Sequence, residues 1–310
     1  MVAKFYKRPS PSLELQALHY LNPRTKLSTS DLRTYEILQK GYLGERKFYH
    51  LLKELLSSDC IVLFDLLLTS NGTTFQIDCI LIFQETIYLI EIKNFEGDFY
   101  RKGENWFSVS TRNEIRNPLL QLNRSEFLLR HFLQSYKYNL PVKPYVVFVN
   151  NAFTLYEAPM QLPIVYPTQL RRFINKINST RSILATQHER LANHFIKHHI
   201  KGTPFGRLPE YNIKDLRTGV TCHRCRHFMV PFSYRKMRCQ NCGDTEGVPS
   251  AIMRSVVEFG VLFPERKITV TSIYEWCGGI FSRSTIRRIL YRHMNLVHKS
   301  QLSYYEFRWD

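Results

Sequence analysis

Two apolar runs decide the fold of this chain: Phe75-Gln76-Ile77-Asp78-Cys79-Ile80-Leu81-Ile82-Phe83 and Thr86-Ile87-Tyr88-Leu89-Ile90-Glu91-Ile92-Lys93. Both runs are rich in branched and aromatic side chains, a composition that predicts β-strands. Only the polar pair Gln84-Glu85 separates them, and a two-residue connection between strands predicts a tight hairpin turn. The two runs therefore predict a β-hairpin within the sheet of an α/β domain.

The register of this hairpin follows from its turn. If Phe83 faces Thr86, counting back along an antiparallel ladder places Asp78 opposite Glu91. Side chains alternate between the two faces of a strand, so Glu91 and Lys93 point to the same side, and Asp78 joins them across the pair. The register thus predicts two carboxylates and one ammonium group on one face of an apolar hairpin.

The simple alternative is that these are solvated charges at frayed strand ends. Against it, Glu91 and Lys93 continue an apolar run, where solvent-facing charges are not expected. Two adjacent carboxylates repel each other unless a cation lies between them. Oxygen ligands of this type suit a hard divalent metal ion, which we expect at Asp78 and Glu91.

Several motifs in a fixed order then resemble the nuclease-related domain, NERD, of the PD-(D/E)xK nuclease-like superfamily. The resemblance covers roughly residues 41 to 155, and Ile77 stands before Asp78 where other members of the superfamily have Pro. The matching motifs are Gly41-Tyr42-Leu43-Gly44-Glu45, Gln76-Ile77-Asp78, Tyr88-Leu89-Ile90-Glu91-Ile92-Lys93-Asn94, Gly97, Trp106 and Asn117-Pro118-Leu119-Leu120-Gln121.

The resemblance implies a role for each polar residue. Asp78 and Glu91 would bind Mg²⁺, with Mn²⁺ as an alternative, and Lys93 would orient the attacking water or stabilise the charged transition state. Glu45 would bind a second ion or steady the first through water, and Gln121 would position a phosphate or a water molecule. Without the resemblance, Glu45 is equally well explained as a solvent-facing helix residue, and Gln121 as a residue at a helix start.

The rest of the chain predicts an α/β fold with a mixed central sheet and flanking helices, as in restriction-endonuclease-like cores. A short helix is expected from Ser30-Asp31 through Leu38, and a second helix opens near Gly44. The predicted parts are an N-terminal arm at 1–40, the nuclease-like domain with a basic helical extension at 41–200, a linker at 201–214, a zinc ribbon at 215–248 and a helix-turn-helix-like module at 249–310.

Charge indicates the class of partner. The chain of 310 residues has 43 Lys and Arg against 26 Asp and Glu, a net charge of +17, which favours a polyanion. We expect nucleic acid, with DNA favoured and RNA left open, and we expect no membrane partner. No apolar segment follows the basic residues at the start, so a cytoplasmic location is predicted. A homo-oligomer remains an option.

Four of the seven cysteines form two C-x-x-C pairs with thirteen residues between them: Cys222, Cys225, Cys239 and Cys242. This spacing predicts a structural Zn²⁺ site of the zinc-ribbon type, with a redox pair or unligated thiols as the alternatives. The other three, Cys60, Cys79 and Cys277, lie in apolar segments and are expected to be buried thiols.

Residues 268–290 predict a helix, a Gly-containing turn and a second helix, a pattern that resembles a helix-turn-helix. Ser282 would cap the second helix, and Arg283, Ser284, Arg287 and Arg288 are the expected DNA contacts. The alternative is an ordinary pair of helices with a basic outer face.

Taken together, the sequence predicts a Mg²⁺-dependent nuclease that hydrolyses phosphodiester bonds in DNA and is targeted by its zinc-ribbon and helix-turn-helix modules. The alternative function is a DNA-binding or regulatory protein whose nuclease-like domain does not cut. The presence of Asp78, Glu91 and Lys93 together favours the enzyme, because a domain that no longer cuts has no need of them.

Overall fold

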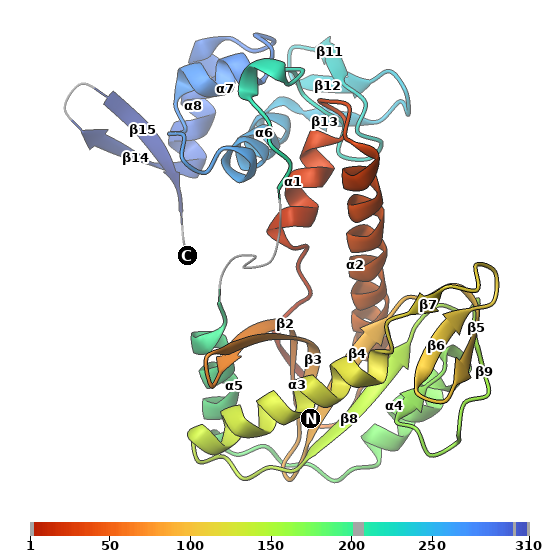
Figure 1. Ribbon diagram of the computed structural model, residues 1–310. Coiled ribbons are helices and arrows are strands. Elements are labelled where there is room, and N and C mark those ends of the chain that lie inside the picture. Colours follow the sequence, from red (N-terminus) through yellow and green to blue (C-terminus); the bar gives the residue numbers. More distant parts are fainter. Residues whose placement is uncertain (1–2, 201–207, 300–301, 309–310) are drawn as a thin grey trace. The chain divides into compact units, whose positions relative to one another are not determined.

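The computed structural model describes residues 3–200, 208–299 and 302–308. The chain divides into two compact units (Figure 1). The first comprises Met1–Pro11 and Ile37–Gly202, and the second comprises Ser12–Glu36 and Thr203–Asp310. Most of the expected N-terminal arm thus belongs to the same unit as the cysteine pairs. Residues 201–207 of the predicted linker lie outside the described residues.

A six-stranded mixed sheet forms the centre of the first unit and confirms the predicted fold class. Its antiparallel part is β2-β3-β4, and β1, β8 and β10 each pair with a parallel neighbour. The strand order is β1 (Lys4–Lys7), β2 (Ile61–Ser70), β3 (Thr73–Ile82), β4 (Ile87–Lys93), β8 (Val142–Phe148) and β10 (Ile164–Val165).

The β3–β4 hairpin has the predicted register. The ladder pairs Cys79 with Ile90 at one end and Ile82 with Ile87 at the other. Next to the turn, the backbone N–H of Phe83 donates to the carbonyl of Thr86 at 2.9 Å. Continued by one residue, this register brings Asp78 to Glu91.

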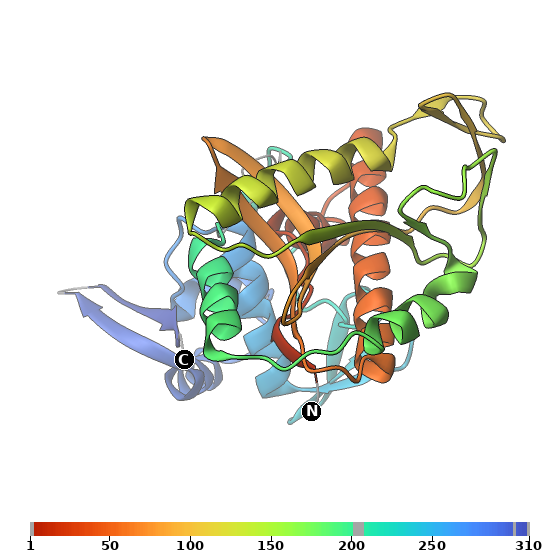
Figure 2. The ribbon, with the colours of Figure 1, turned by 90° about the horizontal axis from the view of Figure 1, so that it is seen from below.

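Helices cover both faces of the sheet (Figure 2). One apolar core includes residues of α3 and α5, and the core on the opposite face includes residues of α2 and α4. A small second sheet has the order β7-β6-β5-β9. These elements are α2 (Thr29–Leu55), α3 (Pro118–Ser135), the 3-10 helix η1 (Pro167–Gln169), α4 (Leu170–Asn178), α5 (Thr186–His198), β5 (Gly97–Lys102), β6 (Asn105–Ser108), β7 (Glu114–Ile115) and β9 (Phe153–Tyr156).

The two helices predicted before the sheet are one continuous helix, α2, so the predicted break before Gly44 is wrong. The Oγ of Ser28 accepts the backbone N–H of Asp31 at 3.1 Å, so the side-chain cap comes from Ser28 and not from Ser30. Gly44 is buried, and a Cβ at this position would lie 2.7 Å from the Cβ of Asn94. The glycine therefore allows close packing and does not end the helix.

The second unit combines a three-stranded sheet, a cluster of helices and a C-terminal hairpin (Figure 1). The N-terminal helix α1 packs against α6 within this unit. The elements are α1 (Leu13–Leu21), the 3-10 helix η2 (Ile213–Asp215), β11 (Met229–Ser233), β12 (Lys236–Cys239), β13 (Thr245–Gly247), α6 (Val248–Leu262), α7 (Val270–Trp276), α8 (Arg283–His293), β14 (Met294–Lys299) and β15 (Leu302–Phe307).

None of the helices in the described part of the chain is both long enough and apolar enough to cross a membrane.

Candidate active site and cysteine metal centre

Asp78 and Glu91 meet where the β3–β4 ladder ends. The Oδ2 of Asp78 accepts the backbone N–H of Ile92 at 2.7 Å. This bond holds the carboxylate of Asp78 against β4, on which Glu91 is almost fully buried at 3% exposure. The hairpin thus fixes one carboxylate by a hydrogen bond and the other by burial.

Lys93 links β4 to helix α3. Its Nζ lies 2.7 Å from the Oε1 of Glu91 and donates to the Oε1 of Gln121 at 3.1 Å. Gln121 stands in the first turn of α3, where the Oδ1 of Asn117 accepts the backbone N–H of Leu119 at 2.9 Å and caps the helix. The structure therefore brings Gln121 to the carboxylate pair.

Glu45 approaches the same cluster from α2. Burial raises the pKa of Glu45 to about 9, and the negative charges of Asp78 and Asp65 add to the effect. In the described part of the chain, the carboxylate oxygens of Glu45, Asp78 and Glu91 are not all within 4.8 Å of one another. Glu45 is therefore a neighbour of the carboxylate pair and does not complete a compact three-carboxylate cage.

The titration of the cluster shows how strongly its charges interact. Burial raises the pKa of Glu91 to about 7, and repulsion from Asp78 contributes. Burial also raises the pKa of Asp78, although Lys93 and the Ile92 N–H oppose this rise. Burial by itself would lower the pKa of Lys93, but attraction to Glu91 and Asp78 outweighs it, and the pKa is raised. The folded protein therefore disfavours ionised carboxylates here, and a bound cation would relieve that cost.

Three charged residues near the cluster were not predicted from the sequence. The Nζ of Lys7 on β1 lies 3.0 Å from the Oδ2 of Asp65 on β2. Asp65 has a left-handed φ of 51° and interrupts the pairing of β2 with β3. Arg116, just after β7, influences the pKa of both Glu91 and Lys93. Asp65 could have been found from the sequence, because it is a charged residue inside an apolar run, as Glu91 is. The sequence around Lys7 and around Arg116 contains no such pattern.

The donor set of the cluster fits a hard divalent cation. Asp78 and Glu91 offer carboxylate oxygens, which are the ligands that Mg²⁺ prefers in proteins. Burial raises the pKa of both groups, and the nearby ammonium of Lys93 opposes this rise without cancelling it. Asp78 and Glu91 are therefore the residues that would hold the metal ion.

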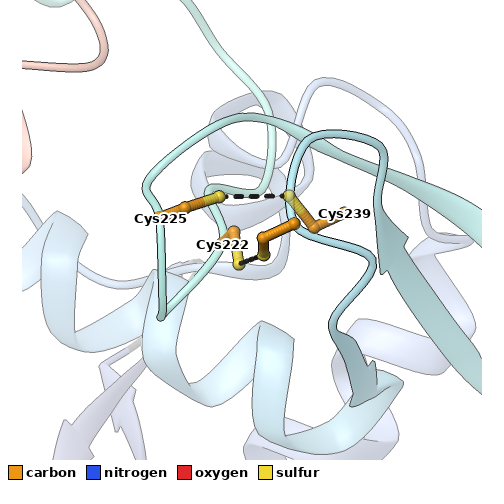
Figure 3. Close-up of side chains that lie close together, drawn as sticks. Cys222, Cys225 and Cys239 are labelled. Carbon is orange, nitrogen blue, oxygen red and sulfur yellow. Dashed lines mark hydrogen bonds between the residues drawn. The ribbon is translucent and has the colours of Figure 1, made fainter.

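The four cysteines of the two C-x-x-C pairs form a compact cluster in the second unit. Figure 3 shows the side chains of Cys222, Cys225 and Cys239 turned toward one another. All four sulfur atoms lie within 4.8 Å of one another. The distances are 3.7 Å between Cys222 and Cys242 and 3.3 Å between Cys225 and Cys239. A tetrahedral zinc site with Zn–S bonds of about 2.3 Å requires sulfur separations of about 3.8 Å. The cluster is therefore consistent with the predicted zinc ribbon.

Each C-x-x-C pair is followed by a residue with a left-handed backbone conformation. Gly243, after Cys242, has a φ of 73°, and Arg226, after Cys225, has a φ of 68°. The Nε2 of His223 lies 3.2 Å from the Oδ2 of Asp244, and these two residues with Cys222 form a second group of metal-ligating atoms. The four sulfur atoms complete a tetrahedral set without them.

The remaining cysteines, Cys60, Cys79 and Cys277, are free and buried, as expected. Burial raises the pKa of Cys60 to about 12 and raises that of Cys277 to about 12. Thiols with such values stay protonated at neutral pH and are poor nucleophiles.

The expected DNA contacts all lie on α8, after a turn in which Gly278 and Gly279 adopt φ values of 69° and 70°. The Oγ of Ser282 accepts the backbone N–H of Thr285 at 3.2 Å and caps this helix, as predicted. Arg283, Ser284, Arg287 and Arg288 are exposed.

Residues 40–149 match the family model of NERD, the nuclease-related domain. The chain therefore carries a NERD domain in its first unit, and the matched segment contains Glu45, Asp78, Glu91, Lys93 and Gln121. No curated protein matches the chain, and no solved structure matches it.

Proposed function

We propose that the protein is a metal-dependent nuclease that hydrolyses phosphodiester bonds in DNA. One observation carries the proposal: within a nuclease-related domain, Asp78 and Glu91 lie at the end of one hairpin, with Lys93 bonded to both Glu91 and Gln121. This set combines ligands for a hard cation with a positive group and an amide that can orient water or phosphate. The second unit would hold the DNA.

The residues have separate tasks in this proposal. Asp78 and Glu91 would hold Mg²⁺, and a bound ion would lower the pKa of a water ligand and offset the charge that develops on the phosphate. Lys93 keeps its proton because its pKa is raised, so its ammonium group can face an incoming phosphate oxygen. Gln121 fixes the position of the Lys93 Nζ, and Glu45 adds a further carboxylate beside the pair.

DNA as the substrate is supported by the net charge of +17 and by the exposed arginines of α8. A polyanion attracts such a protein through the release of its counterions. The alternative, a protein that binds DNA without cutting it, keeps the same partners but has no use for the ion pair of Lys93 with Glu91.

The test is cleavage of several DNA forms by purified protein with added Mg²⁺ or Mn²⁺. Asp78→Asn and Glu91→Gln should each lower the rate by at least about 10²-fold, because each removes a charged metal ligand. Glu54→Gln is the matched control, since Glu54 lies on α2, is exposed and forms an exposed ion pair with Arg171. This control should cut at the wild-type rate.

Two results would overturn the proposal. Cleavage by Asp78→Asn at the wild-type rate would show that the activity does not come from this cluster. A wild-type protein that binds DNA but cuts no DNA form with either metal ion would support the non-cleaving alternative.

A further inference from the structure

The C-terminal part of the second unit contains more than two helices joined by a turn. Along the chain, the order is α6, a single bridging residue, α7, α8 and the β14–β15 hairpin. The bridging residue is Ile268, which pairs antiparallel with Tyr305 of β15 and accepts its backbone N–H at 2.8 Å. β14 and β15 pair antiparallel from Met294 with Phe307 to Lys299 with Leu302. The three helices α6, α7 and α8 are thus followed by the two strands β14 and β15, and the bridging residue Ile268 pairs with β15 in the position of a third strand.

We infer that residues 248–299 and 302–308 form a winged helix-turn-helix that binds duplex DNA, with α8 in the major groove and the strands β14 and β15 as a wing against the flanking DNA. The inference rests on the DNA-binding part of the proposed function and specifies its surface. It does not depend on cleavage by the first unit.

The inner face of α8 is used for packing. Ile286, Ile289 and Leu290 are buried, as are Ile273 and Trp276 of α7. A helix fixed in this way presents the other side of its cylinder to a partner without rearrangement. The core thus decides which side chains of α8 are available.

The outer face of α8 is basic and carries one large aromatic side chain. Its exposed residues recur at helical spacing, and α8 contains no Asp or Glu. Tyr291 is 67% exposed, so its ring is available to a partner on this face. The exposed residues after the first turn are Arg287, Arg288, Tyr291, Arg292 and His293.

Arg283 has a different task from these residues. Its Nη1 donates to the Oγ1 of Thr271 at 3.2 Å, and its guanidinium lies 4.7 Å from the ring centre of Tyr274. Both partners belong to α7, so Arg283 joins the two helices of the motif. We therefore assign base contacts to the Arg287 and Tyr291 face and treat Arg283 as a positioning residue.

The hairpin follows α8 directly, and its described exposed side chains are polar. They are Asn295, His298, Ser303 and Glu306, and the Nδ1 of His298 lies 3.1 Å from the Oγ of Ser303 across the ladder. Asn295 pairs with the acidic Glu306, and strand alternation places this pair on the opposite face from His298 and Ser303. The face with His298 and Ser303 therefore suits hydrogen bonds to phosphate oxygens. Each strand has six residues, about 20 Å in length, which is enough to reach beyond the groove that α8 occupies.

Duplex DNA fits this surface better than RNA. The major groove of B-form DNA is wide enough for an α-helix, whereas the deep, narrow groove of A-form RNA is closed to side chains. A basic helix next to a polar hairpin also complements a continuous row of phosphates.

The test measures duplex affinity in full-length protein that carries Asp78→Asn, so that cleavage does not interfere. Binding of a fluorescent DNA duplex is followed by anisotropy across a salt series, without chelator, so that the cysteine centre keeps its metal. The double variant Arg287→Ala/Arg288→Ala should bind at least about tenfold more weakly, and its salt slope should fall by about two. His298→Glu on the hairpin should also weaken binding, by several-fold.

Arg171→Ala/Arg172→Ala is the matched control, because it removes two exposed arginines from α4 in the first unit. Equal losses in both double variants would show that net charge, not α8, determines binding and would overturn the inference. Equal affinity of wild type for A-form RNA duplex would overturn it in favour of RNA. No duplex binding at all would leave α8 as a protein-interaction surface.

This outcome is separate from the outcome for the proposed nuclease. If α8-dependent binding is found but wild-type protein cuts nothing, the nuclease proposal fails and the winged helix stands. If cleavage depends on Asp78 but duplex affinity does not depend on Arg287, the nuclease proposal stands and the winged-helix inference fails. Unchanged circular dichroism and zinc content in each variant show that the fold is intact.

Discussion

Replacing Arg24 by methionine should strongly destabilise the second unit, although Arg24 lies 234 residues before its ion-pair partner on α6. Its side chain is fully buried, and so is that of Glu258 on α6, at 0% and 1% exposure. The Nε of Arg24 donates to one carboxylate oxygen of Glu258 at 2.8 Å, and Nη2 donates to the other at 3.0 Å. Its guanidinium also donates to the carbonyls of Arg217 and Gly219 and stacks 3.9 Å from the ring of Trp276.

The size of the effect follows from what the substitution leaves behind. A buried carboxylate without its partner costs about 3–5 kcal/mol, and two carbonyls lose their donors in addition. We therefore expect a loss of at least about 4 kcal/mol, which is roughly a thousandfold change in the opening equilibrium. Domains commonly have a net stability of only about 5–15 kcal/mol, so the loss takes a large share of it.

Hydrogen exchange measured by mass spectrometry on the full chain gives the assay. In Arg24→Met, amides of α6 and α7 should exchange much faster, while those of α3 in the first unit should keep their protection. Arg33→Met is the matched control, because Arg33 is exposed on α2. A second variant, Arg24→Met/Glu258→Met, should recover most of the protection, since it leaves no unpaired charge. Wild-type protection of α6 in Arg24→Met would refute the reasoning.

Three further predictions concern packing, charge and metal. Gly44→Ala should destabilise the protein by about 1–3 kcal/mol because its Cβ would meet Asn94, whereas Gly41→Ala has open space and should stabilise it by about 0.5–1 kcal/mol; thermal melts that rank the two variants the other way would contradict the packing argument. Without divalent ions, the stability of wild type should fall as pH rises from about 4.5 to about 9, because the raised pKa of Glu45 means that the folded state disfavours its ionised form; Glu45→Gln should show a flatter curve, and parallel melting curves would count against this. Protein purified without chelator should contain one zinc per chain, and Cys239→Ser should lose it and expose β11–β13 to hydrogen exchange; zinc-free protein with four freely reactive thiols would exclude the site.

Short-range periodicity determined the central hairpin from the sequence alone. A two-residue turn fixes the register of an antiparallel pair, and strand alternation then fixes the faces of Asp78, Glu91 and Lys93. The cysteine spacing predicted the four-cysteine cluster for the same reason, because a C-x-x-C turn brings its two sulfur atoms together locally. These parts of the site follow from geometry that spans only a few residues.

Tertiary structure decided what depends on distant segments. The role of Gly44 within α2 is set by Asn94, which packs where a Cβ would lie, and a glycine in a sequence indicates a helix break as readily as a close contact. The pairing of Lys7 with Asp65, across 58 residues, depends on the parallel pairing of β1 with β2. No local pattern encodes such long-range pairings.

The largest difference between expectation and structure is the place of residues 12–36. Their polar, proline-containing start predicted an arm, yet they belong to the second unit, where Arg24 meets Glu258. A lone arginine in a polar segment looks solvent-exposed, because arginine is rarely buried without a partner. Its partner lies 234 residues away, so the sequence alone determined the local hairpin and cysteine turns, while only the folded chain decided which distant charges pair.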